Sequence, residues 1–338
     1  MRAIGYQQQG SIDRDQALVD IELPTPKPEG RDILVKVEAV SVNPVDTKVR
    51  KGTAPEHGNW KVLGWDASGI VAEIGSEVTL FNPGDEVFYA GSIKRPGTNA
   101  EYHLVDERIV GTKPKTLDWA AAAALPLTTL TAWEMLFDRL DVRKPVPGAA
   151  NAILIVGGAG GVGSIATQLA RQLTDLTVIG TASRPETIAW ATEMGAHSVI
   201  DHTKPLAEQV AALGIGAPAF VFSTTHTDRY ASAIAELIAP QGRLGLIDEL
   251  ADANVFKTKS VSIHWELMYT RSIFSTADIA EQGKLLNEVS SLVDRGVIHT
   301  TMTERFSPID AANLKHVHAL VESGKSRGKL VVEGFRAN

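Results

Sequence analysis

A glycine-rich segment at residues 157–164, with the sequence GGAGGVGS, carries the clearest chemical signal in the chain. It matches the spacing G-x-G-x-x-G, directly after an apolar run and at the start of an amphipathic stretch. Because glycines have no Cβ, a phosphate can approach the backbone closely, and the free amide groups of a helix N-terminus can bind it. We therefore predict a dinucleotide-binding loop rather than a glycine-rich turn without a ligand. Its predicted cofactor-binding residues are Gly158, Gly160, Gly161, Val162 and Gly163.

The end of the next predicted strand distinguishes between the two nicotinamide coenzymes. In NAD sites an acidic residue, about 20 positions beyond the glycines, usually binds the ribose 2′-hydroxyl. Here the strand ends in residues 180–184, GTASR, which contain no carboxylate. Ser183 and Arg184 can instead donate hydrogen bonds to a 2′-phosphate, so the predicted coenzyme is NADPH. The alternative is that Arg184 is only a solvated surface charge.

A polar segment at residues 223–228, STTHTD, follows another predicted strand. In open α/β sheets the ligand lies at the carboxyl ends of the strands. We therefore predict that Ser223 and Thr224 contact the nicotinamide or its ribose, and that Asp228 is the N-cap of the following helix. A hydrolase triad of Ser223, His226 and Asp228 is not favoured, because these residues are too close together along one loop.

Two kinds of periodicity indicate the elements that position these residues. Up to about residue 120, short alternating strands predict a small sandwich or a partly open barrel, with strands at 32–40, 69–75 and 86–89. From about 125 to 270, strands alternate with helices, which predicts a doubly wound parallel sheet. The strands expected there are 152–156, 176–180, 219–222 and 243–247, and the helices are 162–173, 185–194 and 228–239. Two helices, 278–294 and 309–322, and a strand, 329–332, follow; periodicity does not assign them to either domain.

Composition limits the class of protein. A length of 338 residues suggests about two domains. The formal net charge of −7 argues against nucleic acid or an anionic membrane surface as the main partner. The absence of cysteine excludes disulfides, thiolate nucleophiles and zinc sites built on cysteine. With no long apolar run and no signal-peptide pattern, we expect a cytoplasmic protein that acts on a small-molecule substrate.

Five segments together resemble the medium-chain dehydrogenase/reductase superfamily, in its quinone oxidoreductase branch. They are SVNPVD at 41–46, GWDASGIV at 64–71, PGDEV at 83–87, GGAGGVG at 157–163 and RGKLV at 327–331. The resemblance implies an α/β protein with two domains. Residues 1–124 and 273–338 would form a GroES-like, β-rich catalytic domain, and residues 125–272 a Rossmann dinucleotide-binding domain. It also implies a homodimer.

The sequence departs from the zinc alcohol dehydrogenases of this superfamily at the metal ligands. Asn43 occupies the place of the first ligand cysteine, with Asp46 three residues on, and Trp65 replaces the ligand histidine. The third ligand falls near Leu127. Because zinc needs three or four nitrogen, sulfur or oxygen ligands, the resemblance implies a relative that has lost its catalytic zinc and has no metal ligands.

A site without a Lewis acid suits an acceptor that conjugation already activates. The hypothesis is therefore hydride transfer from NADPH to a quinone or an α,β-unsaturated carbonyl. Asn43 is the candidate donor to the substrate carbonyl or the nicotinamide ribose. Asp46 could orient Asn43, and Trp65 could line the pocket. The ordinary alternatives are a turn position for Asn43, a capping or surface position for Asp46 and a core position for Trp65.

Some assignments stay open at this point. Thr131 and Lys329 match positions near the cofactor in relatives, which implies that they contact it here. Residues 264–269, HWELMY, line either the substrate pocket or a dimer edge. Two other functions also remain: a zinc-type alcohol dehydrogenase, and a protein that binds NADPH as a sensor or structural component without catalysis.

Overall fold

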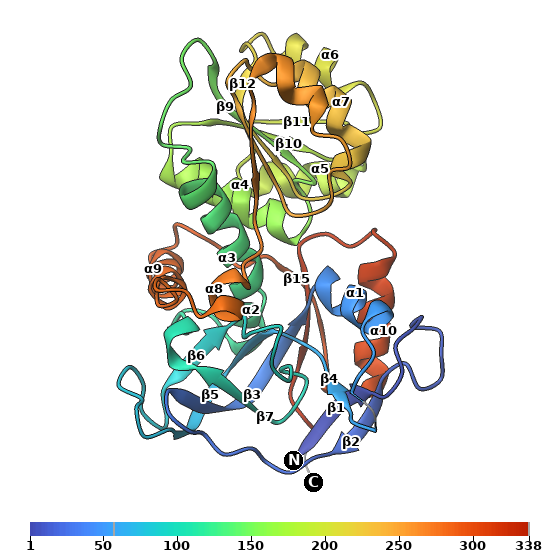
Figure 1. Ribbon diagram of the computed structural model, residues 1–338, viewed down its shortest axis with the longest axis vertical. Helices are drawn as coiled ribbons and strands as arrows, with labels where there is room; N and C mark the ends of the chain where they lie inside the picture. The colour runs from blue at the N-terminus through green and yellow to red at the C-terminus, as the bar shows by residue number, and fades with distance from the viewer. Residues whose placement is uncertain (57, 337–338) are drawn as a thin grey trace. The chain divides into compact units, whose positions relative to one another are not determined.

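The computed structural model describes residues 1–56 and 58–336 (Figure 1). The chain divides into two compact units. Unit 1 combines both ends of the chain, Met1–Leu127 and Tyr269–Asn338, and unit 2 is the middle segment, Thr128–Met268. Both units contain β-sheet, but the strands are parallel in unit 2 and mostly antiparallel in unit 1.

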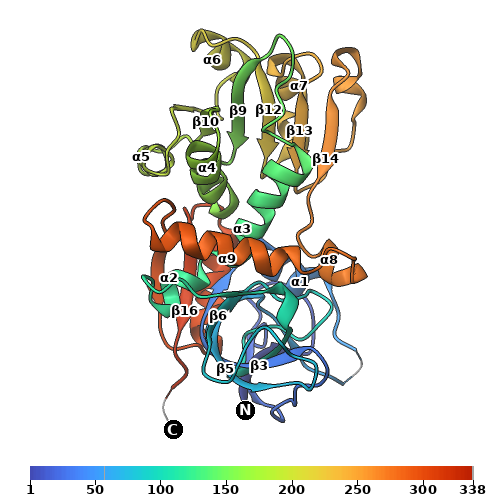
Figure 2. The same ribbon diagram turned by 90° about the vertical axis from the view of Figure 1, so that its left-hand side faces the viewer.

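Unit 2 is built on a six-stranded parallel sheet with the order β11-β10-β9-β12-β13-β14. The strands are β9 (Ala150–Val156), β10 (Thr177–Thr181), β11 (Ser198–Ile200), β12 (Pro218–Ser223), β13 (Arg243–Leu246) and β14 (Ser262–Trp265). Figure 2 shows β9, β12, β13 and β14 side by side. Residues such as Leu154, Val221 and Leu244 are fully buried, as continuous apolar strands in a parallel sheet require.

The connections of unit 2 are helices, as the alternating pattern predicts. They are α4 (Gly161–Leu173), α5 (Pro185–Glu193), α6 (Leu206–Ala212) and α7 (Thr227–Leu237), with α3 (Pro126–Trp133), a π-helix η2 (Glu134–Arg139) and a 3₁₀-helix η3 (Asn254–Lys259). The chain runs from β9 outward through β10 and β11, and then returns to the other side of β9 at β12. This reversal of strand order is the place where doubly wound sheets bind ligands.

One local prediction in unit 2 is wrong. Helix α7 begins at Thr227 and its N-cap is His226, which adopts a left-handed conformation with φ of 50°. Asp228 therefore lies inside the first turn, where its carboxylate accepts a hydrogen bond from the Ala251 amide at 2.6 Å. The helix starts two residues earlier than an N-cap at Asp228 would require, and the left-handed conformation of His226 turns the chain into it.

Unit 1 contains two mostly antiparallel sheets. The larger has the order β15-β16-β3-β5-β6-β8, with β7 also pairing with β3, and the smaller has the order β2-β1-β4. Their strands are β1 (Arg2–Tyr6), β2 (Val19–Glu22), β3 (Asp32–Val42), β4 (Lys61–Val62), β5 (Asp66–Ile74), β6 (Glu86–Tyr89), β7 (Tyr102–Asp106), β8 (Val110–Thr112), β15 (Met302–Phe306) and β16 (Lys329–Glu333). Because β16 pairs antiparallel with β3, the C-terminal segment belongs with the N-terminal one, as the red and blue ribbons of Figure 1 show.

Helices cover the sheets of unit 1. They are α1 (Pro44–Gly52), α2 (Trp119–Ala123), α8 (Thr270–Phe274), α9 (Glu281–Asp294) and α10 (Ala311–Glu322), with a 3₁₀-turn η1 (Glu107–Ile109). Helix α9 packs on β8 and η1, and α1 packs on α10. A largely buried ion pair joins α1 and α10, because the Arg50 guanidinium donates to the Glu322 carboxylate. The fold class predicted from the sequence, a β-rich domain with a parallel-sheet domain, is confirmed.

One helical run, Trp119–Arg139, is long and apolar enough to cross a membrane by length and composition. However, 89% of its most apolar window is buried within the protein. Burial of this kind is expected of a core helix, so the run gives little support to a membrane-spanning segment.

Candidate functional site

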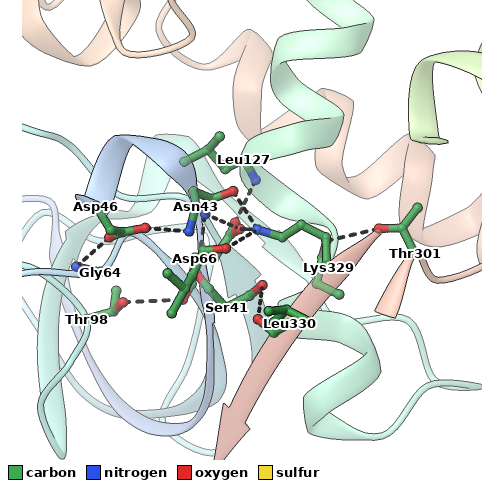
Figure 3. Close-up of polar contacts among 12 residues, drawn as sticks. Ser41, Asn43, Asp46, Gly64, Asp66, Thr98, Leu127, Thr301, Lys329 and Leu330 are labelled. Atoms are coloured by element: carbon green, nitrogen blue, oxygen red, sulfur yellow. Dashed lines mark hydrogen bonds and ion pairs between the residues drawn. The ribbon is translucent and has the colours of Figure 1, made fainter. Parts of the chain in front are cut away.

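A cluster of buried polar side chains lies in unit 1 where three segments meet (Figure 3). It consists of Asn43, which precedes α1, Asp46 in the first turn of α1, Asp66 at the start of β5 and Lys329 at the start of β16. We call these four residues the buried polar cluster. Each is at most 3% exposed. Burying charges is costly unless they are paired, so the contacts within the cluster decide what it can do.

Lys329 supplies the positive charge of the buried polar cluster. Its ammonium donates to Asn43 Oδ1 at 2.5 Å, to Asp66 Oδ2 at 3.1 Å and to the Val42 carbonyl at 3.1 Å. Three acceptors match the three hydrogens of an ammonium group. The lysine is therefore satisfied by the protein itself.

The turn from β3 into α1 places two further members of the cluster, Asn43 and Asp46. Pro44 stands at the first helical position, and Asp46 reaches back so that its Oδ2 accepts from the Asn43 amide at 2.6 Å. The second oxygen of Asp46 accepts from the Gly64 amide at 3.0 Å. Asp46 thus ties the start of α1 to the segment that leads into β5.

The two carboxylates of the buried polar cluster have raised pKa values because burial disfavours their charged forms. Burial raises the pKa of Asp46 from 3.8 to about 7, although its bonds to backbone amides and the charge of Lys329 oppose the change. Burial also raises the pKa of Asp66, and the nearby Lys329 ammonium again opposes it. Asp66 Oδ1 accepts a further hydrogen bond from the Leu127 amide at 2.7 Å.

Asn43 and Trp65, two of the predicted catalytic residues, are both engaged by protein groups. The amide nitrogen of Asn43 donates to Asp66 Oδ2 at 2.8 Å, while its oxygen accepts from Lys329. The indole N–H of Trp65 donates to the Ser92 carbonyl at 3.2 Å. The structure thus brings Asn43, Asp46 and Lys329 into contact and leaves Trp65 beside them. The catalytic roles of these residues stay predictions.

The residues at the zinc-ligand positions do not fit zinc. Asn43 is hydrogen-bonded at both ends of its amide, the Trp65 indole has a donor but no lone pair for a metal, and Leu127 is apolar. The carboxylate of Asp66, the residue after Trp65, is already paired with the Lys329 ammonium. Across residues 1–56 and 58–336, no three His, Asp or Glu side chains gather in a group that could hold a metal ion.

The glycine-rich loop lies in unit 2, between β9 and α4, and it packs tightly against the end of β10. The amide of Gly157 donates to Thr181 Oγ1 at 3.0 Å, and that of Gly158 donates to the Thr181 carbonyl at 3.1 Å. A Cβ on Gly163 would stand 2.1 Å from the Gly157 carbonyl oxygen. Gly163 is therefore required by the packing of the loop itself.

Gly160 differs from Gly163 because the protein does not fill the space beside it. A Cβ at Gly160 would meet only the Gly157 carbonyl oxygen, at 3.4 Å. Gly160 is also the N-cap of α4, so no side chain caps the first amide groups of this helix, which include those of Gly161 and Val162. An open approach to uncapped amides fits the pyrophosphate of a dinucleotide.

Ser183 and Arg184 follow β10 and stand next to a group that the sequence did not single out. Ser183 Oγ lies 3.2 Å from His202 Nε2, and Arg184 pairs with the neighbouring Glu186 at 2.9 Å. Burial lowers the pKa of His202, and the charges of Arg229 and Arg184 lower it further. Arg184, which follows β10, and Arg229, which belongs to α7, therefore both lie near His202 and the end of β10. Sequence spacing gave no sign of His202 or Arg229, since they follow other strands.

The remaining predicted cofactor residues have mainly structural contacts. Ser223 is buried at the end of β12, and its Oγ accepts from Thr227 Oγ1 at 2.8 Å. The hydroxyl of Thr224 donates to the Val156 carbonyl at 2.8 Å, which joins the ends of β12 and β9 beside the glycine-rich loop. Thr131 is buried in α3 of unit 2, whereas Lys329 belongs to the buried polar cluster of unit 1. Their contacts with a cofactor stay predictions.

Comparison with known proteins supports the class that the fold and the glycine-rich loop indicate. The family described as alcohol dehydrogenase GroES-like domain matches residues 29–115, and that described as zinc-binding dehydrogenase matches residues 161–289. The chain is 39% identical to a zinc-type alcohol dehydrogenase-like protein of Staphylococcus epidermidis, over 98% of this chain and 99% of that one. It therefore belongs to the medium-chain dehydrogenase/reductase superfamily and is an oxidoreductase of that group.

Two solved structures extend the comparison. A protein from Rhizobium etli CFN 42, provisionally named a zinc-dependent alcohol dehydrogenase, is 69% identical with a TM-score of 0.98, and covers 100% of this chain and 99% of its own. The quinone oxidoreductase of Coxiella burnetii is 27% identical with a TM-score of 0.80, over 99% of this chain and 99% of its own. The first name mentions zinc, while the zinc-ligand positions of the present chain do not fit that metal.

Proposed function

We propose that this chain is a zinc-independent, NADPH-dependent reductase of quinones or α,β-unsaturated carbonyl compounds. The observation that carries the proposal is the buried polar cluster. The positions that would hold zinc carry Asn43, whose amide is hydrogen-bonded by protein groups, the indole of Trp65 and the apolar Leu127. The Lys329 ammonium neutralises the nearby Asp66. Without a metal to polarise a simple carbonyl or an alcohol, the acceptor must be electrophilic through its own conjugation. Quinones and enones have this property.

The residues of unit 2 account for the binding of the coenzyme. The uncapped amides after Gly160 would hold the pyrophosphate, and the tight packing around Gly163 keeps the loop in that shape. A bound reduced nicotinamide would supply the hydride. The chain's own part is to bind the coenzyme, to orient it and to exclude water from the reacting atoms.

The choice of NADPH rests on the basic group at the end of β10. A 2′-phosphate carries charge that the guanidinium groups of Arg184 and Arg229 can neutralise, and Ser183 can donate a hydrogen bond to it. The residues that end the strand, 181–184, include no carboxylate that would bind a free 2′-hydroxyl.

A homodimer in the cytoplasm is part of the proposal. Strand β14 ends the parallel sheet, and within the described residues no further strand pairs with its outer edge. Trp265 and Leu267, at and just beyond this edge, are 55% and 53% exposed. An open edge with large apolar side chains favours pairing with a second copy.

A turnover assay with a panel of 1,4-quinones, small enones and primary alcohols tests the proposal. We expect oxidation of NADPH with quinones or enones by protein that contains no zinc in elemental analysis, and a lower efficiency with NADH. Tight NADPH binding without reduction of any acceptor would support a sensor or structural role instead. One tightly bound zinc per chain, together with alcohol oxidation, would support the zinc-type alcohol dehydrogenase.

A further inference from the structure

Tyr269 carries a buried hydroxyl that has no hydrogen-bond partner in the part of the chain that the structure describes. The residue is 2% exposed. Two other tyrosines are buried as deeply, and both have partners: the hydroxyl of Tyr6 donates to the Thr53 carbonyl at 2.8 Å, and that of Tyr89 lies 3.1 Å from His103 Nδ1. A buried polar group without a partner costs free energy, so such a group in a folded protein calls for an explanation.

The surroundings of Tyr269 are those of the candidate site. Its ring meets the edge of Trp65, with ring centroids 6.1 Å apart. The carboxylates of Asp46 and Asp66 lie near enough for their charges to help raise the pKa of its hydroxyl. Neither carboxylate forms a hydrogen bond with it, and each of the four carboxylate oxygens accepts from another group.

We propose that Tyr269 donates a hydrogen bond from its hydroxyl to the carbonyl oxygen of the bound quinone or enone. This inference rests on the function proposed above and names a residue that touches the substrate. When the conjugated acceptor takes up hydride, negative charge develops on its carbonyl oxygen. A fixed neutral donor at that oxygen stabilises the charge without any rearrangement of solvent.

Two observations favour Tyr269 over Asn43 for this contact. Both ends of the Asn43 amide are bonded to protein groups, so binding a substrate there would break an existing hydrogen bond. The Tyr269 hydroxyl has no such bond to lose. In addition, burial and the two nearby carboxylates raise the pKa of Tyr269, which keeps the phenol protonated and therefore able to donate.

A pair of matched variants tests the proposal, because Tyr269→Phe and Tyr89→Phe remove the same atom from two equally buried tyrosines. For Tyr269→Phe we expect kcat with quinones or enones to fall about 100-fold, as for the loss of one fixed donor to a developing oxyanion. Its melting temperature should be unchanged or higher, since no protein hydrogen bond is lost. For Tyr89→Phe we expect a lower melting temperature and an unchanged kcat. Full activity of Tyr269→Phe would overturn the proposal.

A measurement without turnover separates this inference from the proposed function. Cyclohex-2-enone is bound to the full-length protein in the presence of oxidised NADP⁺, and its carbonyl stretch is recorded by infrared difference spectroscopy. We expect a lower frequency in the wild type than in Tyr269→Phe, and the same frequency in the wild type and Tyr89→Phe. Equal frequencies in all three proteins would overturn the contact. If the wild type reduces no acceptor yet shows the shift, the proposed activity fails while the hydrogen bond to the carbonyl stands.

Discussion

At the scale of single residues, the ion pair between Lys329 and Asp66 is the feature on which the buried polar cluster depends. Both side chains are almost fully buried and lie 3.1 Å apart. In such a setting the attraction between the charges mainly offsets the cost of removing them from water. Removal of one partner therefore leaves a charge that nothing compensates.

We predict that Lys329→Met destabilises the protein by about 3–5 kcal/mol, because the carboxylate of Asp66 then stays buried without its cation. The free energy of unfolding in urea measures the effect. The double variant Lys329→Met with Asp66→Asn should recover a large part of the loss, since it removes both charges. Equal stability of Lys329→Met and the wild type would show that the pair does not hold the cluster together.

The protonation of Asp46 gives a prediction for pH. Its pKa of about 7 in the folded chain lies above the ordinary 3.8, mainly because of burial. The folded state therefore binds this proton more tightly, and the stabilisation is complete below about pH 4 and lost as the pH rises through about 7. Between these limits the loss amounts to ~4 kcal/mol. The wild type should thus lose stability relative to Asp46→Asn as the pH increases from 4 to 8.

Urea unfolding of both proteins at several pH values measures this difference, apart from a constant offset for the altered hydrogen bonds. The comparison cancels the opposite contribution of buried histidines such as His103, whose pKa burial lowers to about 4. The exposed Asp13 provides the control, because Asp13→Asn removes a carboxylate outside the buried polar cluster. A constant difference for Asp46→Asn would mean that Asp46 is ionised throughout this range.

Arg184 gives a prediction for coenzyme choice. A hydrogen bond from a charged donor to a phosphate contributes more than one to a neutral hydroxyl. Arg184→Ala should therefore weaken the binding of NADPH about tenfold more than that of NADH. Calorimetric titration with each coenzyme measures both constants. Arg295→Ala removes the same charge from an exposed arginine of unit 1 and should affect neither; equal losses for both coenzymes in Arg184→Ala would remove the argument for a 2′-phosphate.

At the scale of elements, the junction between β9 and α4 assigns different roles to its glycines. Gly163 is required by the packing of the loop, whereas a Cβ on Gly160 would meet one backbone oxygen at 3.4 Å. The backbone of Gly160, with φ of −75° and ψ of 176°, is open to any residue. Protein packing and backbone conformation therefore do not require a glycine at this position, which agrees with the coenzyme contact proposed for it.

We predict that Gly160→Ala folds with the stability of the wild type but binds NADPH at least about tenfold more weakly, since the new methyl group stands between the phosphate and the amides. Thermal unfolding without coenzyme and calorimetric titration measure the two effects. Gly52→Ala serves as the control, because a Cβ at this exposed glycine meets nothing within 4 Å. Unchanged affinity in Gly160→Ala would place the pyrophosphate elsewhere.

Elements and their order were predictable because their signals are local. The apolar run of β9, the glycines after it and the helical periodicity of α4 follow one another directly in the sequence. The alternation of strands and helices then predicts a parallel sheet. The site is different. Lys329 and Asp66 are 263 positions apart, and Tyr269 meets Trp65 from a segment whose role the sequence left open. Periodicity carries no information on such distant pairs. Likewise, His202 lies beside Ser183 because the strands that precede them, β11 and β10, are neighbours in the sheet.

At the scale of the whole molecule, both ends of the chain form one unit because β16 pairs with β3. The middle segment can then fold around its own parallel sheet, whose last strand is β14. An edge strand that ends in exposed apolar side chains tends to associate with another edge. A twofold axis beside β14 would pair each copy with the same strand of the other and close the assembly at two chains.

We predict that the wild type is a dimer of twice 36.2 kDa and that the double variant Trp265→Lys with Leu267→Lys is a monomer. Two like charges added to each edge repel their copies across the axis and replace apolar contacts, so association should weaken. Sedimentation velocity at micromolar concentrations measures the mass. Leu80→Lys is the control, because Leu80 is 59% exposed but lies in a loop of unit 1. A dimeric double variant would exclude the β14 edge as the interface, and a monomeric wild type would leave each sheet edge open to solvent.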